Sequence, residues 1–545
     1  GVFATASVVD PFNKAPMMVA ISGGGTANAT NDGTITLTGD RSYGLVAFGP
    51  GGTSTATNNG SITVTGDNSA GIATNGNTTN VNNTGTVTVT GDATYGVRAT
   101  SVTLATTNVT NSGTITQANG GGMVKARYGA SAVFASGPTV NITNTSTGTI
   151  TGTDTALRIA YANTVTIVND GTVNGNVDES GRKVRPVYAK TVPSFSLTNS
   201  GTINGQVVTG FRLASTITNN GGTIGDGTYA VRVNGPSNSV TITGMGNVIN
   251  GAFSSVTGYA AADNVVNFGQ SDTLEITKGT PMGNFAIAQF GTVNFNSGIT
   301  RFGNETAINL FSYSTPTQVN VNAGATLATS STNFQVNARQ LNVSGRGASR
   351  GTLQVPAGST IRVTGDTTFN AGGRFRVGVA SDTSAGYLNG GDGTVTFNAG
   401  SEIYADVTRG VELTDGGSIK IAGVDSGEGG MIVDNNVGGA KVYDNTVLFS
   451  FTSEVRTNSE LFLITKRELR ARTATENRGG RTNAEVIADA IDEFIDNAPS
   501  DNPIVRFLAQ FPVEEQEAQL AKLVEDTLPS ESGSTGSSTV VSTDM

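Results

Sequence analysis

The chain has 545 residues, a formal net charge of −10 and 73 glycines, and it contains no cysteine, histidine or tryptophan. These absences exclude disulfide bridges, thiol chemistry, a Ser-His-Asp triad and a histidine-ligated zinc site. The acidic balance without a basic patch argues against nucleic acid as a partner, and the chain lacks the run of about 20 apolar residues that a membrane-spanning helix needs.

The motif Asn-x-Gly-Thr-(Ile/Val) recurs through the first part of the chain. Close variants are Asn58-Asn59-Gly60-Ser61-Ile62 and Gly148-Thr149-Ile150. A repeat of roughly 20 to 30 residues, made of short strands and turns, is typical of stacked coils and not of a globular core. The full copies occupy residues 31–35, 83–87, 111–115, 169–173 and 199–203.

One repeat, residues 58–73, shows the local pattern. Asn59-Gly60 predicts a turn, and residues 61–65 then alternate so that Ile62 and Val64 share one face and the hydroxyls the other. Identical units in series stack best as parallel strands, so the sequence predicts an all-β fold, a right-handed parallel β-helix (solenoid). With about 22 residues per coil, residues 20–465 would form roughly 20 coils. We also expect the repeated asparagines to form hydrogen-bonded ladders along the core.

Several acidic residues invite a metal or catalytic interpretation. Gly-Asp pairs resemble calcium ligands, but Asp is also a common turn residue, and we favour the turn. Residues 389–393 faintly resemble a calcium-binding nonapeptide repeat, yet they occur once, so we expect a loop. Glycoside cleavage needs two facing carboxylates, and no spacing singles out a pair. The residues considered are Asp40, Asp67, Asp92 and Asp366 for calcium, and Asp154, Asp170, Asp178 and Glu179 for glycoside cleavage.

Two stretches interrupt the repeat and are expected to leave the stacked coils as insertions. The first covers residues 121–138. The second covers residues 158–190 and is basic; a solvated loop is the simpler interpretation, and a binding loop the alternative. Its basic residues are Arg158, Arg182, Lys183, Arg185 and Lys190.

The repeat blurs after about residue 250, although the alternation of polar and apolar residues persists. Residues 351–355 through 373–377, and the closing stretch from 442–445 to 461–464, are similar to the last coils of autotransporter passengers, the type V secreted proteins of Gram-negative bacteria. This resemblance covers residues 351–466. It implies that the segment helps to seed folding of the passenger outside the cell.

The composition changes after residue 466. Residues 482–485 have the pattern of a capping box, and apolar residues at helical spacing follow between 484 and 528. This block resembles the helical linker that autotransporters place before their membrane β-barrel. The alternating strands of such a barrel do not follow, so the barrel is either cleaved off or replaced by another route to the surface. The tail, residues 530–545, is rich in Ser, Thr and Gly and is expected to be disordered.

The sequence therefore predicts β-helix repeats over 1–350, a C-terminal autochaperone-like cap over 351–466, a helical linker over 467–529 and a disordered tail over 530–545. We expect a non-enzymatic, adhesin-like protein at the bacterial cell surface or secreted from it, with no catalytic, metal or cofactor site. Its expected partners are its own outer-membrane β-barrel, surface glycans or proteins, and further copies of itself by lateral association, but not nucleic acid. A structural surface layer or sheath and a polysaccharide-cleaving enzyme are the alternatives.

Overall fold

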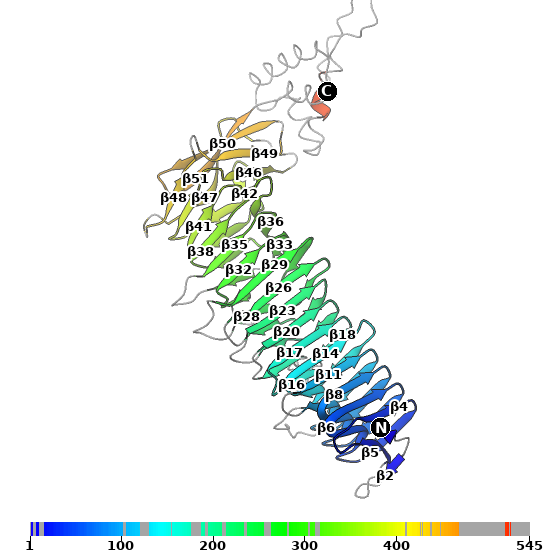
Figure 1. Ribbon diagram of the computed structural model, residues 1–545. Helices are drawn as coiled ribbons and strands as arrows, with labels where there is room; N and C mark the ends of the chain where they lie inside the picture. Colours follow the sequence, from blue (N-terminus) through cyan, green and yellow to red (C-terminus); the bar gives the residue numbers. More distant parts are fainter. Residues whose placement is uncertain are drawn as a thin grey trace, which may run out of the picture. The chain divides into compact units, whose positions relative to one another are not determined.

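The computed structural model divides the chain into two compact units, Gly1–Asn320 with Val336–Arg339, and Val321–Gln335 with Gln340–Met545. Figure 1 shows strands stacked in parallel layers along the chain. The structure describes residues 2–3, 7–9, 16–101, 105–119, 130–153, 155–175, 187–190, 194–209, 214–233, 237–255, 263–280, 283–303, 306–310, 317–408, 411, 413–425, 427, 429–436, 439–446, 448–467, 518–522 and 524.

Each coil of the first unit has three faces. One face is a nine-stranded parallel sheet, called here the threonine sheet: β5 (Thr34–Thr38), β7 (Ser61–Thr65), β9 (Thr86–Thr90), β12 (Thr114–Ala118), β15 (Thr149–Gly152), β18 (Thr172–Gly175), β21 (Thr202–Asn204), β24 (Thr223–Ile224) and β27 (Val248–Ile249). A separate sheet follows the threonine sheet in the sequence, and its first two strands are β30 (Thr273–Ile276) and β33 (Gly298–Phe302).

The other two faces of the first unit are joined because β6 (Tyr43–Asn58) and β8 (Ala70–Asn83) run through the corner between them. One face consists of β3 (Pro16–Ile21), β10 (Tyr95–Ser101), β13 (Ser131–Ser136), β16 (Leu157–Ala160), β19 (Val187–Lys190), β22 (Val207–Val208), β25 (Tyr229–Val233), β28 (Ala252–Ser255), β31 (Phe285–Ala288) and β34 (Ala307–Asn309). The other consists of β4 (Ala27–Asn31), β11 (Thr106–Asn111), β14 (Thr139–Asn144), β17 (Thr164–Asn169), β20 (Ser194–Asn199), β23 (Ala214–Asn220), β26 (Ser239–Gly244), β29 (Val265–Gln270) and β32 (Thr292–Phe295). At the N-terminal end, β1 (Val2–Phe3) pairs with β4, and β2 (Ser7–Val9) pairs antiparallel with β3.

The strands of these faces pair in parallel and in register, as at Val64↔Val89 and Val109↔Ile142. Parallel strands joined by crossovers take the right-handed sense. The prediction of an all-β parallel β-helix is confirmed.

The motif asparagines form a buried ladder, as expected from their repetition. Each side-chain Nδ2 donates to the Oδ1 of the asparagine one coil further on, at 2.6–2.9 Å. The same Nδ2 also lies within hydrogen-bond distance of the motif glycine carbonyl of its own coil, as Asn83 does with Gly85 O at 3.1 Å. The ladder runs through Asn31, Asn58, Asn83, Asn111, Asn144, Asn169, Asn199 and Asn219.

The sequence separation between successive ladder asparagines gives the number of residues in each coil, and this number differs from the expected one. The successive steps of the ladder span 27, 25, 28, 33, 25, 30 and 20 residues. All but one step exceed the expected length of about 22 residues, because each coil carries three strands with their turns. The expectation of roughly 20 coils over residues 20–465 was therefore too high.

The motif glycine is required by the close approach of stacked turns. A Cβ on Gly85 would lie 2.0 Å from the carbonyl oxygen of Gly60, and one on Gly113 would lie 2.0 Å from that of Gly85. Only a residue without a Cβ fits such a column. The inward residues of the adjacent strands, Ile62 and Val64, are fully buried, which confirms the predicted alternation.

One predicted insertion is partly wrong. Within residues 121–138, Ser131–Ser136 forms β13, which pairs in register with β10 and β16. Its inward Val133 and Ala135 fill the core, so their apolar spacing outweighs the irregular length of the preceding segment. Residues 121–129 lie outside the described residues.

The second unit carries its own stacked strands. These are β36 (Ala325–Thr329), β38 (Gln340–Val343), β39 (Gly351–Val355), β40 (Thr360–Val363), β41 (Asp366–Phe369), β42 (Gly373–Ser381), β43 (Ser384–Ala385), β44 (Tyr387–Asn389), β45 (Thr394–Phe397), β46 (Glu402–Val407), β47 (Ser418–Gly423), β48 (Met431–Asp434) and β49 (Lys441–Asp444). The division between the units falls within β35 (Gln318–Val321) and β37 (Asn333–Asn337). Phenylalanines form part of the core: the rings of Phe369 and Phe397 stack with centroids 4.7 Å apart.

Parallel stacking gives way to an antiparallel hairpin in the second unit. β50 (Phe449–Arg456) and β51 (Glu460–Arg467) form the hairpin, and β51 pairs antiparallel with β47. Its turn residues Thr457 and Asn458 both have φ of 51°, the left-handed region used by tight hairpin turns. The hairpin covers an edge of β47 that would otherwise expose unpaired backbone groups.

The predicted helical linker is only partly within the described residues. Residues 518–522 and 524 are α-helical, with Leu520 and Val524 buried, in agreement with the apolar spacing. The remainder of 468–529, and the tail 530–545, lie outside the described residues. Among the residues that the structure describes, none belongs to a helix of the length and hydropathy that crossing a membrane requires.

Candidate binding surface

The strands β39, β42, β46 and β49 of the second unit place charged and aromatic side chains together on one outer face. Alternation turns Phe375, Val377 and Ile403 into the core and leaves their neighbours outside. The parallel register aligns Arg374 with Glu402 and Lys441, and Arg376 with Tyr404 and Tyr443. We call this outer surface the arginine–tyrosine face: Arg350, Arg374, Arg376, Glu402, Tyr404, Asp406, Lys441 and Tyr443.

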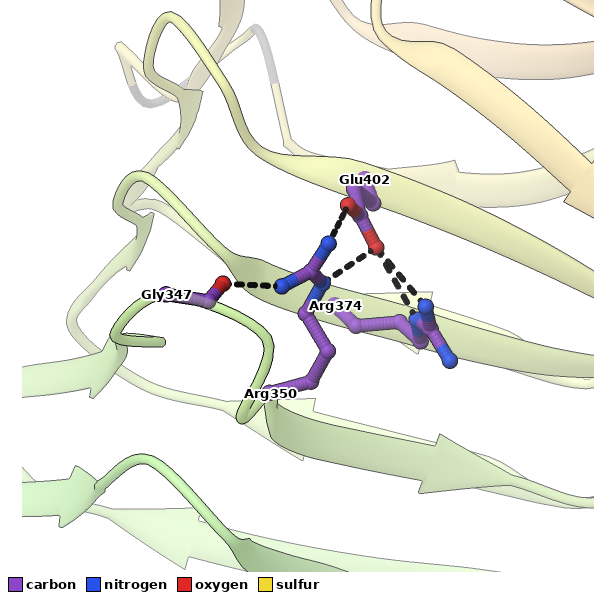
Figure 2. Close-up of polar contacts among 4 residues, drawn as sticks. All are labelled: Gly347, Arg350, Arg374 and Glu402. Atoms are coloured by element: carbon purple, nitrogen blue, oxygen red, sulfur yellow. Dashed lines mark hydrogen bonds and ion pairs between the residues drawn. The ribbon is translucent and has the colours of Figure 1, made fainter.

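Two arginines hold one carboxylate at the edge of this face. Arg350, the residue before β39, meets Glu402 in a bidentate pair, with Nη2–Oε1 at 2.7 Å and Nε–Oε2 at 2.8 Å. Arg374 donates to the same Oε2 from Nη2 at 2.9 Å. Figure 2 shows both guanidinium groups converging on the Glu402 carboxylate, while Arg350 also donates to the carbonyl of Gly347 at 2.6 Å.

The surroundings of Glu402 favour its ionised form. Its side chain is only 8% exposed. Burial by itself raises the pKa of Glu402, but hydrogen bonds and charge from Arg350 and Arg374 outweigh burial and leave the pKa below its ordinary value. A carboxyl that donates a proton in glycoside cleavage needs a raised pKa. Glu402 is therefore suited to holding two arginines in place and unsuited to acid catalysis.

A second ion pair lies two residues further along β42, at Arg376. Arg376 donates from Nε to Asp406 Oδ2 at 3.0 Å, with Nη2 at 2.8 Å from the same oxygen. The other oxygen of Asp406 accepts from Asn445 Nδ2 at 2.9 Å. These partners fix Arg376 beside the neighbouring tyrosine.

The tyrosines form a short aromatic column that the cations cover. The Arg374 guanidinium lies 5.2 Å from the ring centroid of Tyr404 and 5.9 Å from that of Tyr443, and Arg376 lies 5.4 Å from Tyr404. Lys441 Nζ lies 4.6 Å from the Tyr443 centroid, and hydrogen bonding to Tyr443 is the main reason that its pKa is raised. A cation within about 6 Å of a ring centroid is attracted to the ring face, so these contacts hold the cations beside the tyrosines.

The acidic residues singled out in the sequence take part in turn contacts. Asp40 Oδ1 accepts the backbone N–H of Asp67 one coil on, at 2.8 Å, and Asp67 does the same for Asp92. Asp366 Oδ1 accepts from Thr394 N at 2.9 Å. These carboxylates therefore bridge neighbouring coils. Asp40 and Asp67 lie in turns, as we expected, whereas Asp366 is the first residue of β41.

The other carboxylates considered are not brought together by any described contact. Asp170 accepts a hydrogen bond from Ser200 Oγ one coil on. Asp154, Asp178 and Glu179 lie outside the described residues. Among the described residues there is no group of three or more acidic side chains that could hold a metal ion.

We expected the basic stretch at 158–190 to leave the stacked coils as a loop, but its described residues include β16, β17, β18 and β19, which pair with neighbouring coils. Arg158 lies in β16 and Lys190 in β19, where Arg158 pairs with Phe134 and Tyr188, and Lys190 with Ala160. Period-two alternation around Arg158, with Leu157 and Ile159 buried, places it on a regular strand. Residues 176–186, with Arg182, Lys183 and Arg185, lie outside the described residues.

Sequence reasoning missed the arginine–tyrosine face. Arg374 and Arg376 were noted only within the stretch that resembles autotransporters. The available signal was the alternation of polar, charged or aromatic residues with apolar ones in 373–377, 402–407 and 441–443. Comparison of the sequence with known protein families and with curated proteins finds no match.

Proposed function

We propose that this chain is a non-enzymatic, adhesin-like β-helical protein, displayed on a bacterial surface or secreted, which binds acidic material of host or neighbouring cells through a lateral face. The observation that carries the proposal is the arginine–tyrosine face, where cations lie over half-buried tyrosine rings that are in register on neighbouring strands. The resemblance of 351–466 to autotransporter passengers supports the surface or secreted location.

The charge of this face favours an acidic ligand. Its cations are Arg350, Arg374, Arg376 and Lys441, against the two carboxylates Glu402 and Asp406, on a chain whose net charge is −10. Lys441 is exposed and forms no ion pair with a described residue. Carboxylate or sulfate groups of a glycan could bond to Lys441 and the arginine edges, while sugar rings pack on the tyrosines.

Binding of the full chain to immobilised heparin, polygalacturonate and neutral dextran tests this proposal. We expect binding to the two acidic polymers that weakens with salt, and little binding to dextran. Lys441→Glu and Tyr443→Ala should each weaken binding about tenfold or more, the loss of about 1.4 kcal/mol. Lys278→Glu makes the same charge change at an exposed position in the first unit and should leave binding unchanged. Equal binding by all variants, or none by the folded wild type, would contradict the proposal.

A structural surface layer is the second candidate, and one apolar pair favours it. Ile21 and Phe48 lie opposite each other in register and are 62% and 42% exposed. Exposed large apolar side chains on neighbouring strands suit contact with another copy of the chain. Sedimentation velocity should then show concentration-dependent assembly that Phe48→Asp abolishes; a monomer at all concentrations would remove this candidate.

A further inference from the structure

The outer surface of the threonine sheet carries two ranks of side chains in which hydroxyl and methyl groups predominate. Its first rank lies at the first position of eight of the nine strands: Thr34, Ser61, Thr86, Thr114, Thr149, Thr172, Thr202 and Thr223. The ninth strand, β27, has the exposed Val248 at this position. Its second rank lies two residues on: Thr36, Thr63, Thr88, Thr116, Thr151, Asn174 and Asn204. We call these two ranks the threonine lattice. No charged or aromatic residue occupies either rank.

The buried asparagine ladder positions this lattice. Except at Asn219, each ladder Nδ2 also lies near the backbone carbonyl of a first-rank residue in the next coil, as Asn58 does with Thr86 O at 3.3 Å and Asn169 with Thr202 O at 3.2 Å. Side-chain ladders of this kind stabilise untwisted sheets. Threonine is stiff at χ1, so repeated threonines on one regular backbone hold their hydroxyls and methyls alike.

The hydroxyls of the lattice are available to a ligand. Thr34, Thr36 and Thr86 are exposed, and Thr63, Thr88, Thr114 and Thr116 are half-buried. None of these seven hydroxyls forms a hydrogen bond with a described protein group. Further along the lattice, the hydroxyl of Thr151 accepts a hydrogen bond from Asn174 Nδ2 at 3.2 Å. A row of unbonded donors and acceptors in the open must bond to water or to a surface.

The spacing of the lattice matches ordered water. Neighbouring coils are about 4.8 Å apart, and residues i and i+2 of a strand about 6.7 Å apart. In tetrahedral water with bonded oxygens about 2.8 Å apart, second-neighbour oxygens lie about 4.6 Å apart. The hydroxyl repeat along each rank is therefore close to the second-neighbour repeat of hydrogen-bonded water, while the methyls exclude disordered water between them.

We propose that the threonine lattice binds ice. The absence of charge from both ranks disfavours an ionic partner, and the absence of aromatic rings disfavours stacking on sugars. A rigid surface that presents water oxygens at the same repeat satisfies many lattice hydroxyls at once without ordering flexible side chains. This inference does not depend on the arginine–tyrosine face, which lies in the other unit.

Ice-recrystallisation inhibition and thermal hysteresis of the full chain test the proposal. The wild type should slow ice recrystallisation, and the double variant Thr63→Tyr, Thr88→Tyr should need at least a tenfold higher concentration, because two rings interrupt the second rank of the lattice on the adjacent strands β7 and β9. Thr166→Tyr, at an exposed outward position of β17 on another face, is the matched control and should retain full activity. Circular dichroism confirms that each variant keeps its strands.

A second pair of variants separates shape from hydrogen bonding. Thr63→Val and Thr88→Val keep nearly the same volume and replace each hydroxyl by a methyl group, so partial loss of activity is expected. The proposal is overturned if the folded wild type does not affect ice growth, or if the tyrosine variants match it. It is also overturned if the chain binds insoluble chitin or cellulose through these threonines and shows no effect on ice.

Discussion

Asn83 donates from its side-chain Nδ2 to Oδ1 of Asn111 at 2.8 Å, although the two residues are 28 positions apart in the chain. Both side chains are buried, Asn83 at 1% and Asn111 at 0% exposure. Because each asparagine is donor to one neighbour and acceptor from the other, the ladder sets the register of consecutive coils.

Asn111→Ala should destabilise its own coil and both neighbours. The change removes the acceptor of Asn83 and the donor to Asn144, and each buried polar group left without a partner costs about 1–3 kcal/mol. Hydrogen exchange by mass spectrometry over residues 83–149 should report faster exchange. Asn108→Ala, in a half-buried outer ladder, should change little because water replaces the amide. Equal effects of the two substitutions would show that burial of the ladder is unimportant.

Gly85→Ala should disrupt the stack of motif turns. The added Cβ would lie 2.0 Å from Gly60 O, so the backbone must move, and we expect a loss above about 3 kcal/mol in local stability. Gly33→Ala is the control because no atom lies within 4 Å of its added Cβ. Limited proteolysis should cut the Gly85→Ala variant near residues 60–113 and leave the control intact; an uncut Gly85→Ala chain would contradict the close packing.

Glu402→Gln should loosen β39, β42 and β46, because it leaves two arginines without their counter-charge. Removing one partner of such a buried pair costs about 3–5 kcal/mol. The folded-state pKa of Glu402 is lowered, so its contribution to the free energy of unfolding is present above the ordinary glutamate pKa and is lost as pH falls through the lowered value.

Hydrogen exchange of residues 350–407 at neutral and at acidic pH checks this prediction. The wild type should lose protection from exchange in this segment on acidification. The Glu402→Gln variant should be less protected than the wild type at neutral pH and should lose less protection on acidification. Glu454→Gln breaks an ion pair whose side chains are 48% and 39% exposed, and it should have little effect. A wild type with no acid-dependent loss in this segment would count against the ion-pair assignment.

Phe397→Ala should open a cavity in the core of the second unit. Phe397 stacks on Phe369 with an interplanar angle of 7°, and both rings are fully buried. The expected loss is about 3–5 kcal/mol, seen as faster hydrogen exchange in β41 and β45. Phe48→Ala, at a 42% exposed position, should lie within about 0.5 kcal/mol of wild type. Comparable losses at both positions would contradict the core assignment.

The sequence alone was sufficient to predict the β-helix and its ladder. Strand alternation and the Asn-x-Gly-Thr motif are local signals, and identical local signals in series leave stacking as the way to bury Ile62, Val64 and their counterparts. A repeated asparagine at one turn position must then meet its own copy in the next coil. The same logic gave the inward residues of the strands without any knowledge of the structure.

The tertiary structure decided the length of the coils and the composition of their outer faces. Arg350 and Glu402 are 52 residues apart and Arg374 and Glu402 are 28 apart, so they meet only because stacking fixes which outward positions align. Coil length varies from step to step, and no local pattern specifies that alignment. For the same reason, only the structure shows which strands β13 and Arg158 pair with, although local alternation already favours a strand at both places.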